Sequence, residues 1–186
     1  MNRQKNLFSR EEMYYLNVKK LEERGVQLAD IAQIAFRQQS RWKPEISYQE
    51  CLESVQKILS LRDVFHLLQL GAEIDRLTEE KAFQGPIQEV LASDLGLFGI
   101  DELFGLELAG LYGTIGKTNF GDIDVNKPGI ISVLNDMGKH DAKVCHTFMD
   151  DIVGAIAAAA STRVAQVENE IDARRDPSIV ETPKLF

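Results

Sequence analysis

Apolar side chains recur every three or four residues along most of this chain, which is the period of an amphipathic α-helix. Residues 47–59 show the pattern clearly. Ser47 and Glu50 have the spacing of a capping box, and the apolar positions that follow fall on one face of the expected helix. In the first half of the chain, this rhythm predicts helices within residues 9–25, 28–40, 47–59 and 62–82.

Gly85 and Pro86 interrupt the pattern, and helical stretches resume after them. No convincing alternation of apolar and polar residues predicts a strand. Because amphipathic stripes must pack against one another, we predict an all-α bundle of about six to eight helices around a central Ala/Gly-rich helix. Helices are expected within residues 86–94, 99–113, 127–138 and 141–175.

We expect residues 1–175 to form a single helical domain made of two regions. Residues 1–84 read as ordinary amphipathic helices, whereas residues 85–160 are richer in glycine and contain most of the unusual acids. The tail, residues 176–186, carries two prolines and is expected to be extended or disordered.

Composition narrows the functional classes. The chain has 186 residues, 44% of them hydrophobic, and a net charge of −8 without a basic stripe, which argues against nucleic-acid binding. The two cysteines, Cys51 and Cys145, are expected to be reduced core thiols. There is no signal-peptide pattern and no stretch approaching the roughly 18 apolar residues of a membrane span. We therefore expect a soluble, cytoplasmic protein.

The segment FMDDIVGAIAAAAS, residues 148–161, places two acids beside the smallest side chains of the chain. If Asp141 caps a helix that starts near residue 142, Asp150 and Asp151 lie two turns inside it, where a carboxylate is costly unless paired or metal-bound. The alternative is that one element ends at Phe148 or Met149 and that Asp150 caps a new helix.

A second segment repeats this pattern: DELFG, residues 101–105, matches DDIVG, residues 150–154, as acid, acid, apolar, apolar, glycine. Two such helices crossing at their glycines would bring together up to four carboxylates. Hard divalent cations prefer oxygen ligands of this kind, and Mg²⁺ commonly binds through one or two carboxylates together with substrate phosphate. The predicted ligands are Asp101, Glu102, Asp150 and Asp151.

A third segment, residues 120–131, contains Asp124 and Lys127, followed by Pro128. A proline suits the first turn of a helix, and a lysine beside free helix amides makes an anion site. The alternative is a plain turn with an exposed lysine.

These three segments, in this order, resemble the phosphatidylglycerophosphatase A family. The similar features are an Asp seven residues before an Asp-Glu pair with a following Gly (Asp94, Asp101, Glu102 and Gly105), a Phe-Asp segment leading to Lys-Pro, and a Met-Asp-Asp-Ile-Val segment. They span residues 93–160. The whole chain is similar to a soluble Gram-positive branch with a helical N-terminal extension, here residues 1–84, and with the stretch YGTIGKTNFG, here residues 112–121.

The resemblance implies a bundle with one central helix, a phosphatase-like core in residues 85–160, and Mg²⁺-dependent removal of phosphate from a phosphomonoester. The family substrate is the lipid phosphatidylglycerophosphate. The sequence differs from the membrane-bound members of the family in two ways, and both differences concern the lipid substrate more than the metal chemistry. Transmembrane helices are not predicted, and the Gly-Thr-x-Gly motif, N-terminal in membrane-bound members, matches only residues 113–116, after the acid pair.

The expected roles follow from these features. The four acids would hold one or two Mg²⁺, Lys127 would bind phosphoryl oxygens, and Asp94 or Asp124 would act as general acid–base or as a further ligand. Thr118 and Asn119 are expected to contact the substrate. The nucleophile is left open between water and an aspartate.

Two other functions remain as alternatives: an all-α Mg²⁺-dependent nucleotide pyrophosphohydrolase, and a binding or regulatory homologue without turnover. The expected partners are a phosphorylated small molecule or a phospholipid. Contact with a membrane surface is possible without a span, although a chain this acidic would be repelled by anionic lipid. Exposed amphipathic stripes also predict a homo-oligomer.

Overall fold

The computed structural model describes residues 7–94, 99–141 and 143–175. Within these ranges the chain forms nine helices and no strand, which confirms the all-α prediction with one helix more than the upper expected number. The helices are α1 (Arg10–Glu23), α2 (Leu28–Ser40), α3 (Tyr48–Leu59), α4 (Arg62–Glu79), α5 (Pro86–Ala92), α6 (Ile100–Gly110), α7 (Gly113–Asn126), α8 (Ile130–His140) and α9 (Met149–Arg175).

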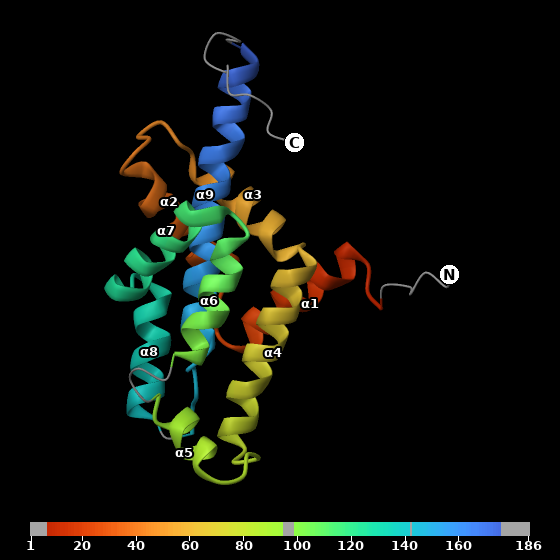
Figure 1. Cartoon of the computed structure of the whole chain (residues 1–186), viewed down its shortest axis with the longest axis vertical. Helices are drawn as coiled ribbons and strands as arrows, with labels where there is room; N and C mark the ends of the chain where they lie inside the picture. Colours follow the sequence, from red (N-terminus) through yellow and green to blue (C-terminus); the bar gives the residue numbers. More distant parts are fainter. Residues whose placement is uncertain (1–6, 95–98, 142, 176–186) are drawn as a thin grey trace.

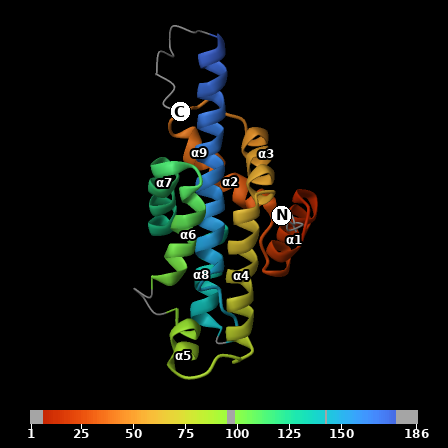
Figure 2. The same ribbon diagram turned by 45° about the vertical axis from the view of Figure 1, so that its right-hand side comes forward.

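Helix α9 runs through the middle of the bundle, as predicted (Figures 1 and 2). It packs against α2, α3, α4, α6, α7 and α8. Its side chains from Ile152 to Ala160 are buried, and those of Ala157 to Ala160 have no exposed surface. Small side chains allow neighbouring helices to approach from all sides, which explains why the most alanine-rich segment became the axis of the fold.

The two regions expected on either side of residue 85 share this axis. Helices α2, α3 and α4 from the first region and α6, α7 and α8 from the second all contact α9, whereas α1 lies further out against α3 and α4 (Figure 2). The predicted tail, residues 176–186, lies outside the described residues. Among the described helices, none combines the length and the apolar character that crossing a bilayer requires.

Local signals placed several helix ends correctly. Ser9 with Glu12 and Ser47 with Glu50 form the two predicted capping boxes, in which each serine accepts the N3 amide and each glutamate accepts the N-cap amide. Pro86 occupies the first turn of α5, immediately after Gly85 at φ 71°. These signals work because the interacting groups are only a few residues apart.

The predicted start of the last helix is wrong. Asp141 is the C-cap of α8, and α9 begins only at Met149, so Asp150 and Asp151 lie in its first turn rather than two turns inside it. This start is close to the alternative considered for the sequence. Acids at this position are favoured by the helix dipole, and here they are also buried, with exposed fractions of 5% and 4%.

The predicted crossing of two helices at their glycines is also wrong. Helices α6 and α9 do pack together, but their glycines face other helices. A Cβ atom added at Gly105 would lie 2.2 Å from the ring tip of Phe120 on α7, whereas one added at Gly154 would lie 3.3 Å from Ile123 on α7 and 3.5 Å from Ile131 on α8. Gly105 therefore makes room for an aromatic side chain of a third helix.

Candidate functional site

Helices α6 and α9 run in the same direction and begin at the same end of the bundle (Figure 1). Each carries an acid pair in its first turn: Asp101 and Glu102 on α6, Asp150 and Asp151 on α9. Carboxylate oxygens of Asp101, Glu102 and Asp151 all lie within 4.8 Å of one another. Two helix N-termini therefore direct their partial positive charge toward one group of carboxylates.

Two oxygens of this group lack a hydrogen-bond partner. Oδ1 of Asp101 and Oε2 of Glu102 are buried and unpaired, and the Asp101 side chain is only 6% exposed. A buried carboxylate oxygen without a donor is costly, and coordination of a cation is one way to satisfy it. The residues present therefore suit a hard divalent cation, which prefers oxygen ligands.

Lys127 does not precede a helix in the manner predicted. It is the C-cap of α7, and α8 starts three residues later, at Ile130. Its ammonium group contacts Asp124 Oδ1 at 2.7 Å, Asp150 Oδ2 at 3.0 Å and Asp151 Oδ1 at 3.4 Å. The alternative of an exposed turn lysine is also wrong, because Lys127 is engaged on the acidic side of the site.

The backbone near the site is strained at two positions. Among the described residues, only Lys81, Asp94 and Lys127 combine a side chain with positive φ. For Lys127 (φ 41°, ψ 56°) this left-handed conformation costs roughly 1–2 kcal/mol, and it places the ammonium group between the carboxylates of α7 and α9. Strain of this kind is common where a side chain must be aimed precisely.

Burial dominates the electrostatics of the acids. It raises the pKa of Asp151 to about 9, that of Asp101 to about 7 and that of Asp150 to about 6, each against an ordinary value of 3.8. Neighbouring carboxylates raise the pKa of Asp151 and Asp101 further, whereas Lys127 lowers the pKa of Asp150 and Asp151. Burial alone would lower the pKa of Lys127, but its acidic neighbours outweigh this effect and raise it. A bound cation would relieve the repulsion among the acids.

Asp94 and Asp124 lie at the edge of this group. Asp94 is half-buried after α5, and burial raises its pKa, with opposing effects from Lys127 and Lys139. Asp124 is half-buried on α7 and bound to Lys127. Six predicted acids and the predicted lysine therefore gather at one end of the bundle: Asp94, Asp101, Glu102, Asp124, Lys127, Asp150 and Asp151.

The two remaining predicted residues lie elsewhere. Asn119 donates hydrogen bonds to Ser161 Oγ and Thr162 Oγ1 on α9, about 15 Å along that helix from Asp151 by helical rise. Thr118 is exposed and bonds the carbonyl of Ile115 in its own helix. The structure does not bring these two side chains to the acidic group.

The Gly-Thr-x-Gly match serves the turn between α6 and α7. Gly113 has φ +74°, and a Cβ atom at Gly116 would lie 2.1 Å from the carbonyl oxygen of Ala109. Both positions therefore need glycine for backbone reasons. No contact of this segment with the acids is seen among the described residues.

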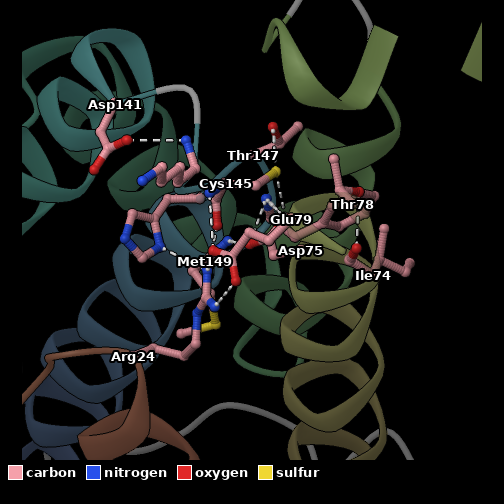
Figure 3. Close-up of polar contacts among 12 residues, drawn as sticks. Arg24, Ile74, Asp75, Thr78, Glu79, Asp141, Cys145, Thr147 and Met149 are labelled. Carbon is pink, nitrogen blue, oxygen red and sulfur yellow. Dashed lines mark hydrogen bonds and ion pairs between the residues drawn. The ribbon is translucent and has the colours of Figure 1, made fainter. Parts of the chain in front are cut away.

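Sequence reasoning missed Asp75 on α4. Its carboxylate has no exposed surface and accepts the amides of Phe148, at 3.1 Å, and Met149, at 3.0 Å, so it caps the start of α9 from another helix (Figure 3). The Cys145 thiol also contacts it, at 3.5 Å. The available signal was an acid within the apolar stripe of α4, three residues after Ala72.

Arg24 and Glu79 hold the loop that leads into α9. Arg24 binds Glu79 through two contacts of 2.8 and 3.0 Å, and it also donates to the carbonyl of Cys145 (Figure 3). Glu79 accepts the amide of Cys145 at 2.9 Å, and Arg24 lies 3.2 Å from His146 Nδ1. His146 is therefore committed to this network, and burial together with Arg24 lowers its pKa to about 4.

Fold and site together define an all-α protein whose central helix starts in a buried group of acids with a lysine beside it. The chain belongs to the phosphatidylglycerophosphatase A family, whose model matches residues 26–166. That match extends beyond residues 93–160, where the similar motifs lie, and takes in α2, α3 and α4.

Relatives and solved structures agree with this assignment. The chain is 43% identical over 146 residues to the "Uncharacterized protein YutG" of Bacillus subtilis, covering 78% of this chain and 86% of that protein. The low temperature requirement C protein from Listeria monocytogenes has a similar structure, with TM-score 0.80, 38% identity and coverage of 84% and 97%. Protein ypjQ from Bacillus subtilis matches with TM-score 0.81, 36% identity and coverage of 88% and 99%.

Proposed function

We propose that this protein is a Mg²⁺-dependent phosphomonoester hydrolase of the phosphatidylglycerophosphatase type. The observation that carries the proposal is the group formed by Asp101, Glu102 and Asp151, with two unpaired buried oxygens, beside the ammonium group of Lys127. A cation held by carboxylates and a fixed positive charge both stabilise the negative charge of a reacting phosphate group. Membership of the family supports the same reaction class.

Asp101, Glu102 and Asp151 supply carboxylates for the cation, directly or through water. A bound Mg²⁺ would neutralise phosphate charge and lower the pKa of a coordinated water. Lys127, whose side chain is 28% exposed, would hold a phosphoryl oxygen at the open side of the site. Asp124 and Asp150 keep its ammonium group in that position.

Asp94 is the better of the two proposed proton donors. Its raised pKa keeps the carboxyl group protonated to higher pH, so that it can donate a proton to the departing alkoxide. The carboxylate of Asp124 is already engaged by the ammonium group of Lys127, at 2.7 Å. The attacking group remains water or an aspartate, and trapping of a phosphoenzyme with labelled substrate would distinguish them.

The surroundings of the acid pair favour a substrate with an apolar part. Ile100 and Leu103 come directly before and after Asp101 and Glu102 in the sequence of α6 and are 45% and 56% exposed. Exposed apolar side chains beside a charged site suit a phosphorylated lipid better than a nucleotide. We therefore propose a lipid phosphomonoester as the substrate class.

Release of inorganic phosphate from a substrate panel, with Mg²⁺ and with EDTA, tests this function. The panel contains a short-chain phosphatidylglycerophosphate, glycerol phosphate and a nucleoside triphosphate. We expect Mg²⁺-dependent release of orthophosphate from the lipid monoester, and we expect Asp101→Asn to reduce it by about 10³-fold or more, because a cation ligand is lost. Asp122→Asn, which changes a partly exposed acid on α7 that pairs with Arg41 instead of Lys127, is the matched control and should keep full activity.

Other outcomes favour the alternatives. Release of pyrophosphate from the nucleotide would identify a pyrophosphohydrolase instead. Binding of Mg²⁺ without turnover of any panel member would identify a binding or regulatory homologue. Full activity of Asp101→Asn would mean that the site lies elsewhere.

A further inference from the structure

The adjacent acids Asp150 and Asp151 have different surroundings, although the sequence makes them look equivalent. Oδ1 of Asp150 accepts the amide of Asp151 at 2.9 Å, and Oδ2 accepts the ammonium group of Lys127 at 3.0 Å. Each oxygen of Asp150 thus already has a donor. Asp151 instead contributes an oxygen to the group with Asp101 and Glu102, and its contact with Lys127 is longer, at 3.4 Å.

Lys127 binds the acids around it unequally. Its ammonium group binds Asp124 and Asp150 at 2.7 and 3.0 Å and contacts Asp151 at 3.4 Å. Asp151 also belongs, with Asp101 and Glu102, to the only group of three potential ligands with converging oxygens that the described residues contain. A divalent cation coordinated by Asp150 Oδ2 would lie close to the ammonium group and would be repelled by it.

Asp101 gives independent support for a ligand at this group. Its side chain is only 6% exposed, and Oδ1 accepts no hydrogen bond. An oxygen in this state is poorly satisfied by the protein itself, although the neighbouring Asp150 is fully paired. The carboxylate oxygens that lack a partner therefore lie on α6, close to Asp151.

We propose that the two aspartates divide the work: Asp151, Asp101 and Glu102 bind one divalent cation, whereas Asp150 and Asp124 hold Lys127 as a second, fixed positive charge. The site then takes one metal ion per chain, and the lysine stands where a two-metal enzyme would place its other cation. Three carboxylates leave coordination positions for water and for a phosphate oxygen. The role of Lys127 toward phosphate rests on the proposed function, but the division of the acids does not.

Binding of Mn²⁺ to the substrate-free protein tests the division directly. Titration followed by the electron paramagnetic resonance signal of free Mn²⁺ gives both stoichiometry and affinity. We expect one Mn²⁺ per chain, at least tenfold weaker binding in Asp151→Asn and Asp101→Asn, and a change of no more than about threefold in Asp150→Asn. Asp122→Asn is the surface control, and circular dichroism establishes that each variant is folded.

Lys127→Met provides a second test. Because it removes a positive charge beside the cation, Mn²⁺ binding should be unchanged or tighter, whereas binding of inorganic phosphate in the presence of Mn²⁺ should weaken at least tenfold. Phosphate affinity should also fall in Asp150→Asn, because the ammonium group loses its anchor.

Two results would overturn the division: equal loss of Mn²⁺ affinity in Asp150→Asn and Asp151→Asn, or binding of two ions per wild-type chain. These results differ from a failure of the proposed function. If the protein binds one Mn²⁺ with the expected variant pattern but hydrolyses no monoester, the different roles of the two aspartates are supported and the phosphatase function is rejected. Hydrolysis with two bound ions would do the reverse.

Discussion

Gly105, one turn after Asp101 on α6, leaves no room for a larger side chain. A Cβ atom there would lie 2.2 Å from the ring tip of Phe120, which is itself only 2% exposed. We expect Gly105→Ala to destabilise the protein by about 1–3 kcal/mol, because the overpacked ring cannot move freely between three helices. The free energy of unfolding, measured by urea denaturation, checks this prediction.

Gly154→Ala is the matched comparison. Its added Cβ atom would meet Ile123 at 3.3 Å and Phe120 at 3.6 Å, which needs only a small adjustment. A gain in helix propensity of up to about 1 kcal/mol should leave this variant near wild-type stability. Phe120→Leu should partly rescue Gly105→Ala in a double-mutant cycle. Equal destabilisation by the two glycine substitutions would contradict the packing described.

At the scale of elements, the start of α9 depends on a cap supplied by α4. Replacing Asp75 with alanine leaves the buried amides of Phe148 and Met149 without their acceptor. Each unsatisfied group costs about 1–3 kcal/mol, so we expect Asp75→Ala to lower the free energy of unfolding by at least about 2 kcal/mol. Asp75→Asn retains one oxygen acceptor and should lose less. Urea denaturation of the three proteins measures the difference.

Ser54→Ala is the control for this prediction. Ser54 is also buried and also anchors α9, by donating to the carbonyl of Ala160 at 2.9 Å, but it does so far from the first turn. We expect it to cost about 1 kcal/mol, as an ordinary hydrogen bond does. If Asp75→Ala is no more destabilising than Ser54→Ala, the cap is not what holds the start of α9.

The same element shows which parts of the fold were predictable from the sequence. The caps of α1 and α3 were found because a serine and a glutamate three residues apart interact directly. The start of α9 was misplaced because its acceptor, Asp75, lies 73 residues before Phe148 in the chain. Local patterns predict helices well, but a cap supplied by another helix leaves no signal near the helix end that it caps.

At the scale of the whole molecule, the N-terminal region helps to position the acidic site. Arg24 and Glu79, from the ends of α1 and α4, hold the backbone of Cys145, and Asp75 holds the next turn. These contacts set the position of Asp150 and Asp151 at the other end of the sequence. Shared packing around α9 therefore makes the acidic site a product of both predicted regions.

Most residues of the site could be predicted from the sequence, but their arrangement in space could not. Charge and spacing identified six of the seven residues that gather there, because acids next to small residues are unusual and can be read from the sequence, and the family resemblance added Asp94. They could not show that Asp150 faces Lys127 while Asp151 faces Asp101, since adjacent helix residues diverge by about 100° and only the neighbouring helices decide what each meets. Thr118 and Asn119 failed to join the site for the same reason.

The collected acids should also control how the stability of the whole molecule depends on pH. Folding raises the pKa of Asp151 to about 9, that of the buried Asp75 to about 8 and that of Asp101 to about 7, so the folded chain holds more protons than the unfolded chain between pH 3.8 and these values. Stability from these groups therefore decreases as pH rises through that range. His146 opposes this change only up to about pH 7.5, because its pKa falls from 6.5 to about 4 on folding and it is neutral in both states at higher pH.

We accordingly expect the Tm of the metal-free protein to fall between pH 6.5 and pH 8.5, in thermal unfolding with EDTA. Added Mg²⁺ binds the deprotonated carboxylates, so it should raise Tm more at pH 8.5 than at pH 6.5, by about 5–10 °C at a hundredfold excess over Kd. The double variant Asp101→Asn, Asp151→Asn should show a flatter pH profile and no Mg²⁺ effect. An equal rise in Tm at both pH values would mean that Mg²⁺ binding releases no protons from the acids of α6 and α9. A rise that persists in the double variant would mean that Mg²⁺ binds without Asp101 and Asp151. Either result would place the bound cation outside this site.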